Sequence, residues 1–107
     1  MELVNRFASQ AKSFLGSSFV QAILYGSYAR GDNRSDSDMD VMILTTKSSE
    51  EIGRIEDTIL DMAYEFMYED NVTISVNIQN VNHFEYWVDT LPYYSNIRKE
   101  GLVLAER

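Results

Sequence analysis

The sequence contains no cysteine, which excludes disulfide bonds and thiolate metal sites as supports for the fold. This absence is typical of proteins in a reducing compartment. Long hydrophobic runs are missing as well. No stretch approaches the roughly 20 apolar residues that cross a bilayer, and the first residues lack the apolar core of a signal peptide. We therefore expect a cytoplasmic protein that makes no membrane contact.

Positive charge is also scarce. Nine Lys and Arg residues stand against 17 Asp and Glu residues, which gives a net charge of −8. A broad nucleic-acid-binding face needs clustered Lys and Arg, so we expect none here. The same negative field repels a phosphate-rich ligand, unless a divalent cation or a nest of backbone N–H groups offsets it.

The length of 107 residues is that of one domain, and we expect a single domain over residues 1–107. Hydrophobic residues make up 45% of the chain and charged residues 24%, the balance of a soluble globular protein. We find no internal repeat, low-complexity segment or linker that would divide the chain.

Hydrophobic periodicity predicts that helices alternate with strands. The predicted elements are helix 3–15, strand 19–25, a short helix 27–30, strand 39–44, a long helix within 45–70, strand 72–79, a short helix in 82–90, another after 91 and a strand 102–104. Ser48 or Ser49 suits the cap of the long helix, and Asn82 that of the helix in 82–90. The predicted fold class is α/β (α+β), with a small mixed β-sheet flanked by helices.

Gly26 and Ser27 lie where a buried strand is expected to pass into a helix. Such a tight turn exposes backbone N–H groups to an anion. Glycine lets a ligand approach the backbone closely, and the Ser27 hydroxyl can donate to a phosphate oxygen. An ordinary strand-to-helix turn uses the same residues, so this pair alone does not identify a site.

Asp38 and Asp40 open the next strand, and residues two apart on a strand face the same side. Two neighbouring carboxylates repel each other, and a hard cation such as Mg²⁺ or Mn²⁺ removes that cost. The alternative is that both lie in water at the strand's start. Asp32 and Asp36, in the preceding loop, are interpreted as solvated turn residues.

The two features together are more specific than either alone. Ten residues separate Ser27 from Asp38, so adjacent strands would bring the turn and the carboxylate pair to one edge of the sheet. A bound metal would then lie beside a bound phosphate, the arrangement that phosphoryl and nucleotidyl transfer require.

The stretch GSYARGDNRSDSDMDVMIL, residues 26–44, resembles the nucleotidyltransferase superfamily that includes DNA polymerase β, through the pattern G-S-x10-D-x-D. Together with the ending YYSNIRKEGLVL, it is similar to the minimal nucleotidyltransferase (MNT) domains of bacteria and archaea. The resemblance implies the family's α/β core. It also implies that Gly26 and Ser27 hold the β- and γ-phosphates, that Asp38 and Asp40 bind Mg²⁺ at the catalytic centre, and that Arg30 lies near the nucleotide.

The resemblance further implies transfer of a nucleoside monophosphate from an NTP, with ATP expected, to an acceptor hydroxyl. Minimal nucleotidyltransferases are often paired with a HEPN-domain protein in toxin–antitoxin modules, where the nucleotidyltransferase is the antitoxin and modifies the toxin with AMP. A partner protein or a second copy of the chain would supply the acceptor-binding surface. Small-molecule adenylylation stays an alternative, although a chain of this length has little room for such a pocket.

One departure from the family concerns a third acidic residue on a later strand. Strand 72–79 offers Ser75 and Asn77 on its polar face and no carboxylate. Asn77 can ligate a metal through its carbonyl oxygen, but it supplies neither charge nor a base. Alternatively, Asp70 or Glu85 approaches the site and supplies the third acidic group. The departure also supports a second hypothesis, a weak or inactive module of the same fold that neutralises its partner by contact.

Two further residues carry expectations. His83 is the single histidine and follows a strand, which favours a surface or capping role over catalysis. Tyr28 lies inside the motif and is the aromatic side chain expected near a nucleotide.

Overall fold

The computed structural model describes residues 2–107, and for Asp70 the backbone alone. Its elements are α1 (Glu2–Leu15), η1 (Gly16–Ser18), β1 (Phe19–Tyr25), α2 (Ser27–Arg30), β2 (Met39–Thr45), α3 (Ser49–Asp70), β3 (Ile74–Asn80), α4 (Val81–Trp87), α5 (Pro92–Glu100) and β4 (Leu102–Glu106). This order confirms the predicted succession of helices and strands, to which the structure adds the single 3₁₀ turn η1.

The four strands form one mixed sheet in the order β3-β2-β1-β4. β1 runs antiparallel to both of its neighbours, β2 and β4, whereas β2 and β3 are parallel. α3 provides the crossover that a parallel pair requires. The predicted α/β class with a small mixed sheet is therefore confirmed.

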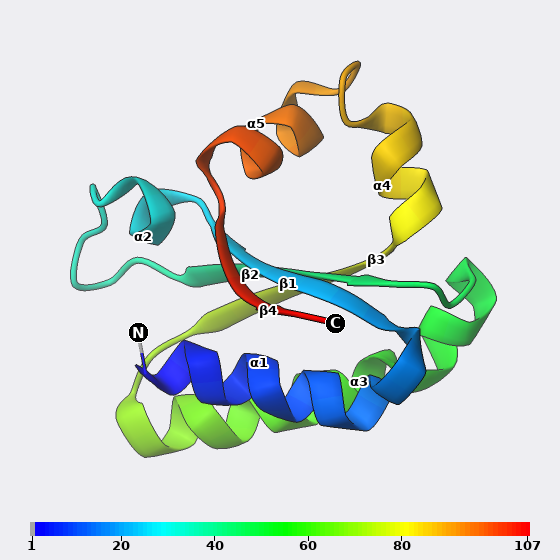
Figure 1. The fold of residues 1–107 in the computed structure, drawn as a ribbon. Helices are drawn as coiled ribbons and strands as arrows, with labels where there is room; N and C mark the ends of the chain where they lie inside the picture. The colour runs from blue at the N-terminus through cyan, green and yellow to red at the C-terminus, as the bar shows by residue number, and fades with distance from the viewer. Residues whose placement is uncertain (1) are drawn as a thin grey trace.

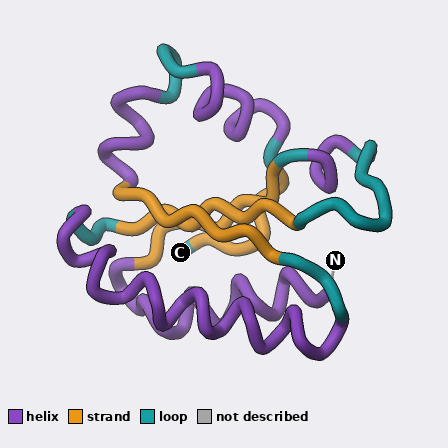
Figure 2. Tube along the Cα trace, turned by 180° about the vertical axis from the view of Figure 1, so that it is seen from behind, coloured by secondary structure: helices purple, strands orange, loops and turns teal. Residues whose placement is uncertain are grey.

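Helices cover both faces of the sheet. Figure 1 shows α1 and α3 beneath it and α4 and α5 above it, and the view from behind in Figure 2 agrees. Alternate residues of β2 divide between the two faces: Val41 and Ile43 pack in the core with α1 and α3, while Met42 and Leu44 pack with α4 and α5. None of the helices within residues 2–107 is both long and apolar enough to span a bilayer.

The start of α3 follows from a capping box. The Ser48 hydroxyl accepts a hydrogen bond from the Glu51 N–H at 3.2 Å, and the Glu51 carboxylate accepts one from the Ser48 N–H at 2.9 Å. Ser48, one of the two predicted caps, is thus the residue that caps this helix.

The boundaries of β3 and α4 differ from the prediction. β3 begins at Ile74 rather than at residue 72 and continues to Asn80. Asn80, not Asn82, caps α4, because its side-chain oxygen accepts hydrogen bonds from the N–H groups of Asn82 and His83. The helix therefore follows the strand with no loop between them. The sequence could not separate the two candidates, because either asparagine satisfies the residue preference of a helix cap.

Candidate functional site

The phosphate-type turn and the carboxylate pair meet at the end of β1. In the antiparallel pairing, Tyr25 is the partner of Asp40, so Gly26 lies beside the start of β2. A Cβ atom built on Gly26 would lie 2.4 Å from Oδ2 of Asp40, and Gly26 has a φ of +77°. Both the close approach and the backbone conformation therefore require glycine at this position.

Ser27 opens the single turn of α2, as predicted. The Gly26 carbonyl accepts from the Arg30 N–H at 3.1 Å, and the Ser27 carbonyl accepts from the Gly31 N–H at 2.9 Å. Gly31 ends the turn with a φ of +81°. α2 is thus a single turn, and it lies at the edge of the molecule in the view of Figure 1.

Asp38 and Asp40 differ in exposure. Asp38 is exposed just before β2, while Asp40 is half-buried and lies on the α4–α5 side of the sheet, opposite to the buried Met39 and Val41. Burial raises the pKa of Asp40, the negative charge of Asp38 raises it further, and the positive charge of Arg30 opposes both.

Two carboxylates that repel each other form a donor set that suits a divalent cation. Mg²⁺ is commonly held by one or two carboxylates, with substrate phosphates and water as its other ligands. Among the described residues, no cluster of three or more His, Cys, Asp or Glu side chains could hold a metal by itself. Asp38 and Asp40 therefore fit a cation that arrives with a phosphate ligand.

Arg30 lies at the mouth of the site. Its guanidinium pairs with Asp32 at 3.2 Å and with Glu100 of α5 at 3.5 Å, and the Asp32 carboxylate raises the pKa of Arg30. Asp32 is exposed, as predicted for a turn residue, but it orients this arginine as well. Arg30 is thus held toward α5 rather than free in solvent.

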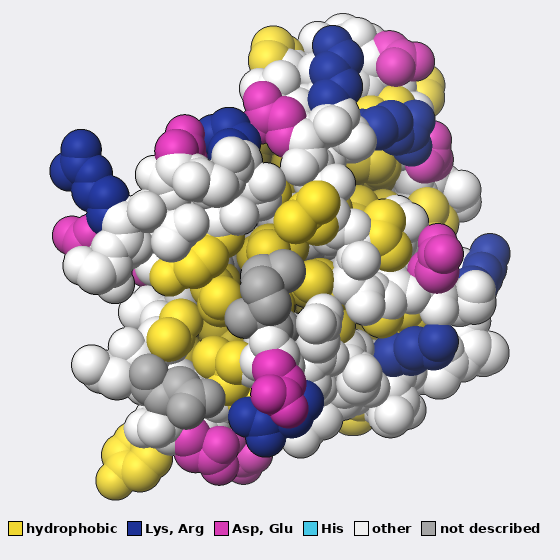
Figure 3. Space-filling model, turned by 60° about the vertical axis from the view of Figure 1, so that its left-hand side comes forward, with side chains coloured by type: hydrophobic (Ala, Val, Ile, Leu, Met, Phe, Trp, Pro, Cys, Tyr) yellow, Lys and Arg dark blue, Asp and Glu magenta, His cyan; other side chains and the backbone are white. Residues whose placement is uncertain are grey.

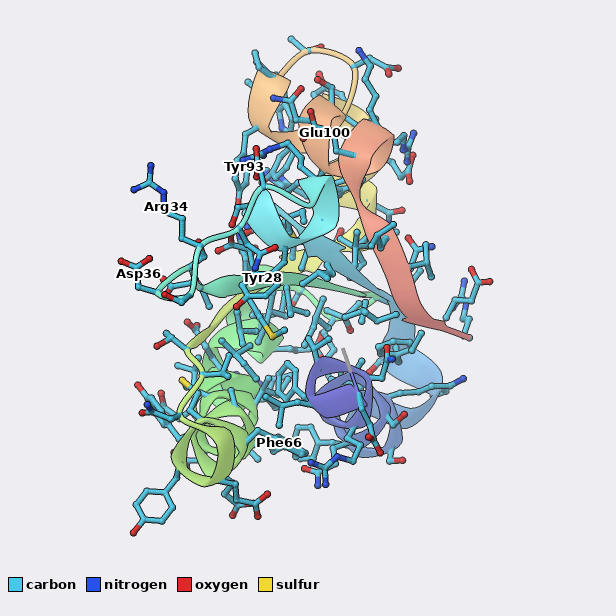
Figure 4. The ribbon with its side chains drawn as sticks, turned by 90° about the vertical axis from the view of Figure 1, so that its left-hand side faces the viewer. Tyr28, Arg34, Asp36, Phe66, Tyr93 and Glu100 are labelled. Carbon is cyan, nitrogen blue, oxygen red and sulfur yellow. The ribbon has the colours of Figure 1, made fainter. Side chains whose placement is uncertain are left out.

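A hollow of about 450 Å³ separates α5 from the phosphate-type turn. Its lining residues are Tyr25, Gly26, Arg30, Tyr93, Asn96, Ile97 and Glu100. Figure 4 shows Tyr93 and Glu100 above α2, on the side of this hollow. The hollow therefore joins the turn that would hold phosphates to polar and aromatic side chains of α5.

The β3 position beside Asp40 belongs to Ser75, and Asn77 is the partner of Met42. The Asn77 amide donates to the Tyr93 hydroxyl at 3.0 Å and accepts from the Gln79 amide at 3.3 Å. The carbonyl oxygen of an amide has two lone pairs, so the oxygen that accepts from Gln79 can still bind a metal. A metal-binding role for Asn77 stays a prediction.

Of the two alternative acids, Glu85 does not extend the site. Glu85 of α4 pairs with Arg98 of α5, which holds its carboxylate at the helix pair rather than at Asp40. The side chain of Asp70 lies outside the described residues. The described part of β3 therefore supplies polar groups to the site without a carboxylate.

Tyr25 and Tyr93 form a hydroxyl pair beside the carboxylates. Their Oη atoms are 2.7 Å apart, and their rings meet edge to face at 5.9 Å. Burial raises the pKa of Tyr25 well above its ordinary value, and the hydrogen bond to Tyr93 raises it further. Tyr25 therefore stays protonated, and either hydroxyl can donate in this hydrogen bond. No local pattern indicates this pair, because the two tyrosines lie 68 positions apart in the chain.

The prediction for Tyr28 is wrong. Its side chain packs against the core between the sheet and α1 and α3, on the far side of α2 from the hollow (Figure 4). His83 has the predicted surface and capping position: it is exposed, its N–H donates to Asn80, and its ring meets Tyr94 edge to face.

A family model described as "Polymerase beta, Nucleotidyltransferase" matches residues 10–106. A Methanocaldococcus jannaschii protein named as a protein adenylyltransferase (MJ0604) is 26% identical over 102 residues, which cover 94% of this chain and 93% of that protein. A second protein of that organism with the same kind of name (MJ0141) is 41% identical over 44 residues, covering 41% of this chain and 44% of that protein.

Solved structures share the fold. A structure described as a nucleotidyltransferase from Sulfolobus solfataricus has a TM-score of 0.62 at 18% identity and covers 99% of this chain and 79% of its own. A structure described as a toxin–antitoxin with AMP-PNP has a TM-score of 0.58 at 14% identity and covers 96% of this chain and 73% of its own.

Proposed function

The chain belongs to the polymerase β nucleotidyltransferase family, and from that premise we propose that it transfers AMP from ATP to a hydroxyl group of a partner protein in the cytoplasm. Pyrophosphate is the leaving group. One observation carries the proposal: the Gly26 backbone packs directly against the Asp40 carboxylate, which brings a phosphate-type turn and a cation-binding pair together.

Each residue of the site has a role in this proposal. Gly26 and Ser27 bind the β- and γ-phosphates, and Arg30 lies where it can contact the nucleotide in the hollow beside α5. Asp38 and Asp40 would hold Mg²⁺ or Mn²⁺, a cation that neutralises charge on the triphosphate when bound. Asp40 is half-buried, which fixes its carboxylate against the turn and orients the ligands that it holds.

The proposed acceptor is a protein, and three observations support this choice. A relative covering nearly the whole chain is named as a protein adenylyltransferase, and a structural neighbour is described as a toxin–antitoxin. Figure 3 shows apolar side chains at the centre of the face beside α2, with acidic and basic groups around them and no basic patch. We propose that the partner is a HEPN-domain toxin and that this chain is its antitoxin.

The decisive experiment combines the chain with ATP labelled at the α-phosphate, Mg²⁺ and a HEPN-domain protein as the proposed partner. Label is expected on the partner, and it should be lost in Asp38→Asn and Asp40→Asn. Asp36→Asn, which alters an exposed carboxylate of the same loop, is the matched control and should keep the transfer. Transfer that survives Asp40→Asn contradicts the proposal.

A second candidate is a binding module that neutralises its partner by contact. The observation in its favour is Ser75, the β3 neighbour of Asp40, where a third carboxylate would complete the charge of the site. If the chain is a weak enzyme, Ser75→Asp is expected to raise the rate of AMP transfer. Complete absence of transfer in both forms, with a complex that survives Asp38→Asn and Asp40→Asn, would establish the binding module instead.

A further inference from the structure

The Tyr93 hydroxyl of α5 lies over the strand that carries Asp40. It bonds to the Tyr25 hydroxyl of β1 at 2.7 Å and to the Asn77 amide of β3 at 3.0 Å. β1 and β3 flank β2 in the sheet, and both side chains point to its α4–α5 side. An oxygen within reach of both therefore lies above β2, on the face to which Asp40 also points.

Tyr93 also shares the hollow in which the nucleotide is proposed to bind. It lines this space together with Gly26 and Arg30, and its side chain is 48% exposed. Its neighbour Tyr94, by contrast, is 7% exposed and packs in the core beneath α4 and α5. Of these two adjacent tyrosines, only Tyr93 is exposed and lines the hollow.

The bonding of this oxygen suits a nucleophile. Asn77 donates to it from β3, and the Tyr25 hydroxyl of β1, which shares a hydrogen bond with it, can donate as well. Donors held in place on both sides stabilise the negative charge that develops on a phenol oxygen during attack, because they are already oriented before the reaction begins. Tyr86, although 75% exposed, packs against Trp87 and lacks such donors among the described contacts.

We propose that Tyr93 is an internal acceptor, so that the chain adenylylates its own Tyr93. The inference rests on the proposed function, because it uses the same ATP and the same carboxylates. Tyr93 Oη forms a bond to the α-phosphorus, the bond from that phosphorus to the oxygen bridging to the β-phosphate breaks, and pyrophosphate leaves. The phenol proton passes to water, and the product is a tyrosyl-AMP ester in the hollow.

The first test uses the purified chain alone, with ATP labelled at the α-phosphate and Mg²⁺. Mass spectrometry of the digested wild-type chain is expected to locate one AMP group on Tyr93. Labelling should be lost in Tyr93→Phe and retained in the matched control Tyr86→Phe. Because the site is mapped in the wild-type chain, the result does not depend on how well Tyr93→Phe folds.

Pyrophosphate release with the HEPN-domain partner present separates this inference from the proposed function. Release with label on the partner, but none on Tyr93, overturns the inference and leaves the proposed function standing. Label on another residue of the chain also overturns it. No release and no label in any mixture overturns both.

A mixing experiment tests whether the transfer occurs within one chain. Asp40→Asn keeps Tyr93 but loses the carboxylate, whereas Tyr93→Phe keeps the carboxylate but loses the acceptor. When the two variants are mixed with ATP and Mg²⁺, the geometry predicts that the Asp40→Asn chain stays unlabelled. Label on that chain would show transfer between copies and overturn the intramolecular arrangement.

Discussion

At the scale of single residues, two glycines with left-handed backbones have very different surroundings. Gly26 has a φ of +77° and lies against the Asp40 carboxylate, whereas Gly31 has a φ of +81° and open space where a Cβ would be. An alanine at either position strains the backbone, by about 1–2 kcal/mol at Gly31, whose φ and ψ are those of a left-handed helix, and by about 1–3 kcal/mol at Gly26, whose ψ of −153° lies in a region essentially confined to glycine. Only at Gly26 would it also displace a carboxylate of the site.

We therefore predict that Gly26→Ala abolishes binding of a non-hydrolysable ATP analogue in the presence of Mg²⁺, because the added methyl group would displace Asp40. Gly31→Ala should lose a similar amount of stability from backbone strain but keep its affinity within a few-fold. Isothermal titration calorimetry measures the affinities, and thermal unfolding measures the stabilities. Equal losses of affinity in the two variants would contradict this role for Gly26.

Asp40 allows a second prediction at this scale. Its pKa in the folded chain is raised above the ordinary value of 3.8, chiefly by burial and then by the charge of Asp38. A carboxyl group with a raised folded pKa favours the folded state while protonated, and this contribution is lost as the pH rises through the folded pKa. At neutral pH the ionised Asp40 is therefore destabilising.

Asp40→Asn should consequently raise the melting temperature at pH 7. The difference should shrink as the pH falls and disappear below 3.8, where Asp40 is protonated in both states. Scanning calorimetry of both chains across this pH range, without divalent cations, measures it. A variant less stable than the wild type at pH 7 would show that the carboxylate is stabilised by its surroundings.

At the scale of elements, the capping box of α3 offers a direct test. Ser48 satisfies a backbone donor of the first turn, and Ser49 is an exposed neighbour inside the helix. Ser48→Ala should lower the free energy of unfolding by about 1 kcal/mol, and Ser49→Ala should change it little. Urea unfolding of both variants provides the comparison, and equal effects would argue against the cap.

The elements were largely predictable because each has a strong local signal. The alternation of β3 places Ile74 in the core with α1 and α3, as its period of two requires. The capping rule does not choose between two residues that satisfy it equally, as Asn80 and Asn82 do at the start of α4. Local rules also fail for Phe14, which has helical spacing in α1 yet is 43% exposed, because the width of the buried stripe depends on what packs against it.

At the scale of the whole molecule, the negative charge is concentrated on one helix. The acidic residues of α3 are Glu50, Glu51, Glu56, Asp57, Asp61, Glu65, Glu69 and Asp70. Arg54 is the one basic residue in the sequence of this helix. Figure 1 places α3 on the face opposite to α4 and α5. The field of the molecule is therefore uneven, and it attracts a basic partner from a distance.

We predict that association with the proposed toxin slows steeply with salt. Raising the ionic strength from about 0.05 M to 0.5 M should lower the association rate constant by about tenfold or more, while the dissociation rate constant changes less. Stopped-flow fluorescence at several salt concentrations measures both constants. An association rate constant independent of salt would contradict electrostatic attraction between the partners.

The glycine turn and the carboxylate pair of the site were predictable from the sequence, whereas the tyrosine that α5 contributes was not. Gly26, Ser27, Asp38 and Asp40 lie close together in the sequence, and adjacent strands bring them together as expected. Tyr93 reaches the same place from α5, and no local pattern specifies how α5 packs on the sheet. Tyr28 was misplaced for a related reason: the single turn of α2 points its side chain into the core, and only the packing of α1 and α3 determines that direction.

The pairing of β4 with β1 has a consequence for how the molecule is made. β4 follows the other three strands in the chain, yet it pairs with β1, the strand that leads into Gly26. Once β2 has been synthesised, the glycine turn and both carboxylates are present. One edge of β1 nevertheless stays unpaired until β4, which begins at Leu102, leaves the ribosome. Open strand edges recruit other chains. Chains truncated after Glu100 should therefore sediment as aggregates while the chain that includes β4 stays in solution, which would make the emergence of β4 the step that creates a nucleotide-binding molecule.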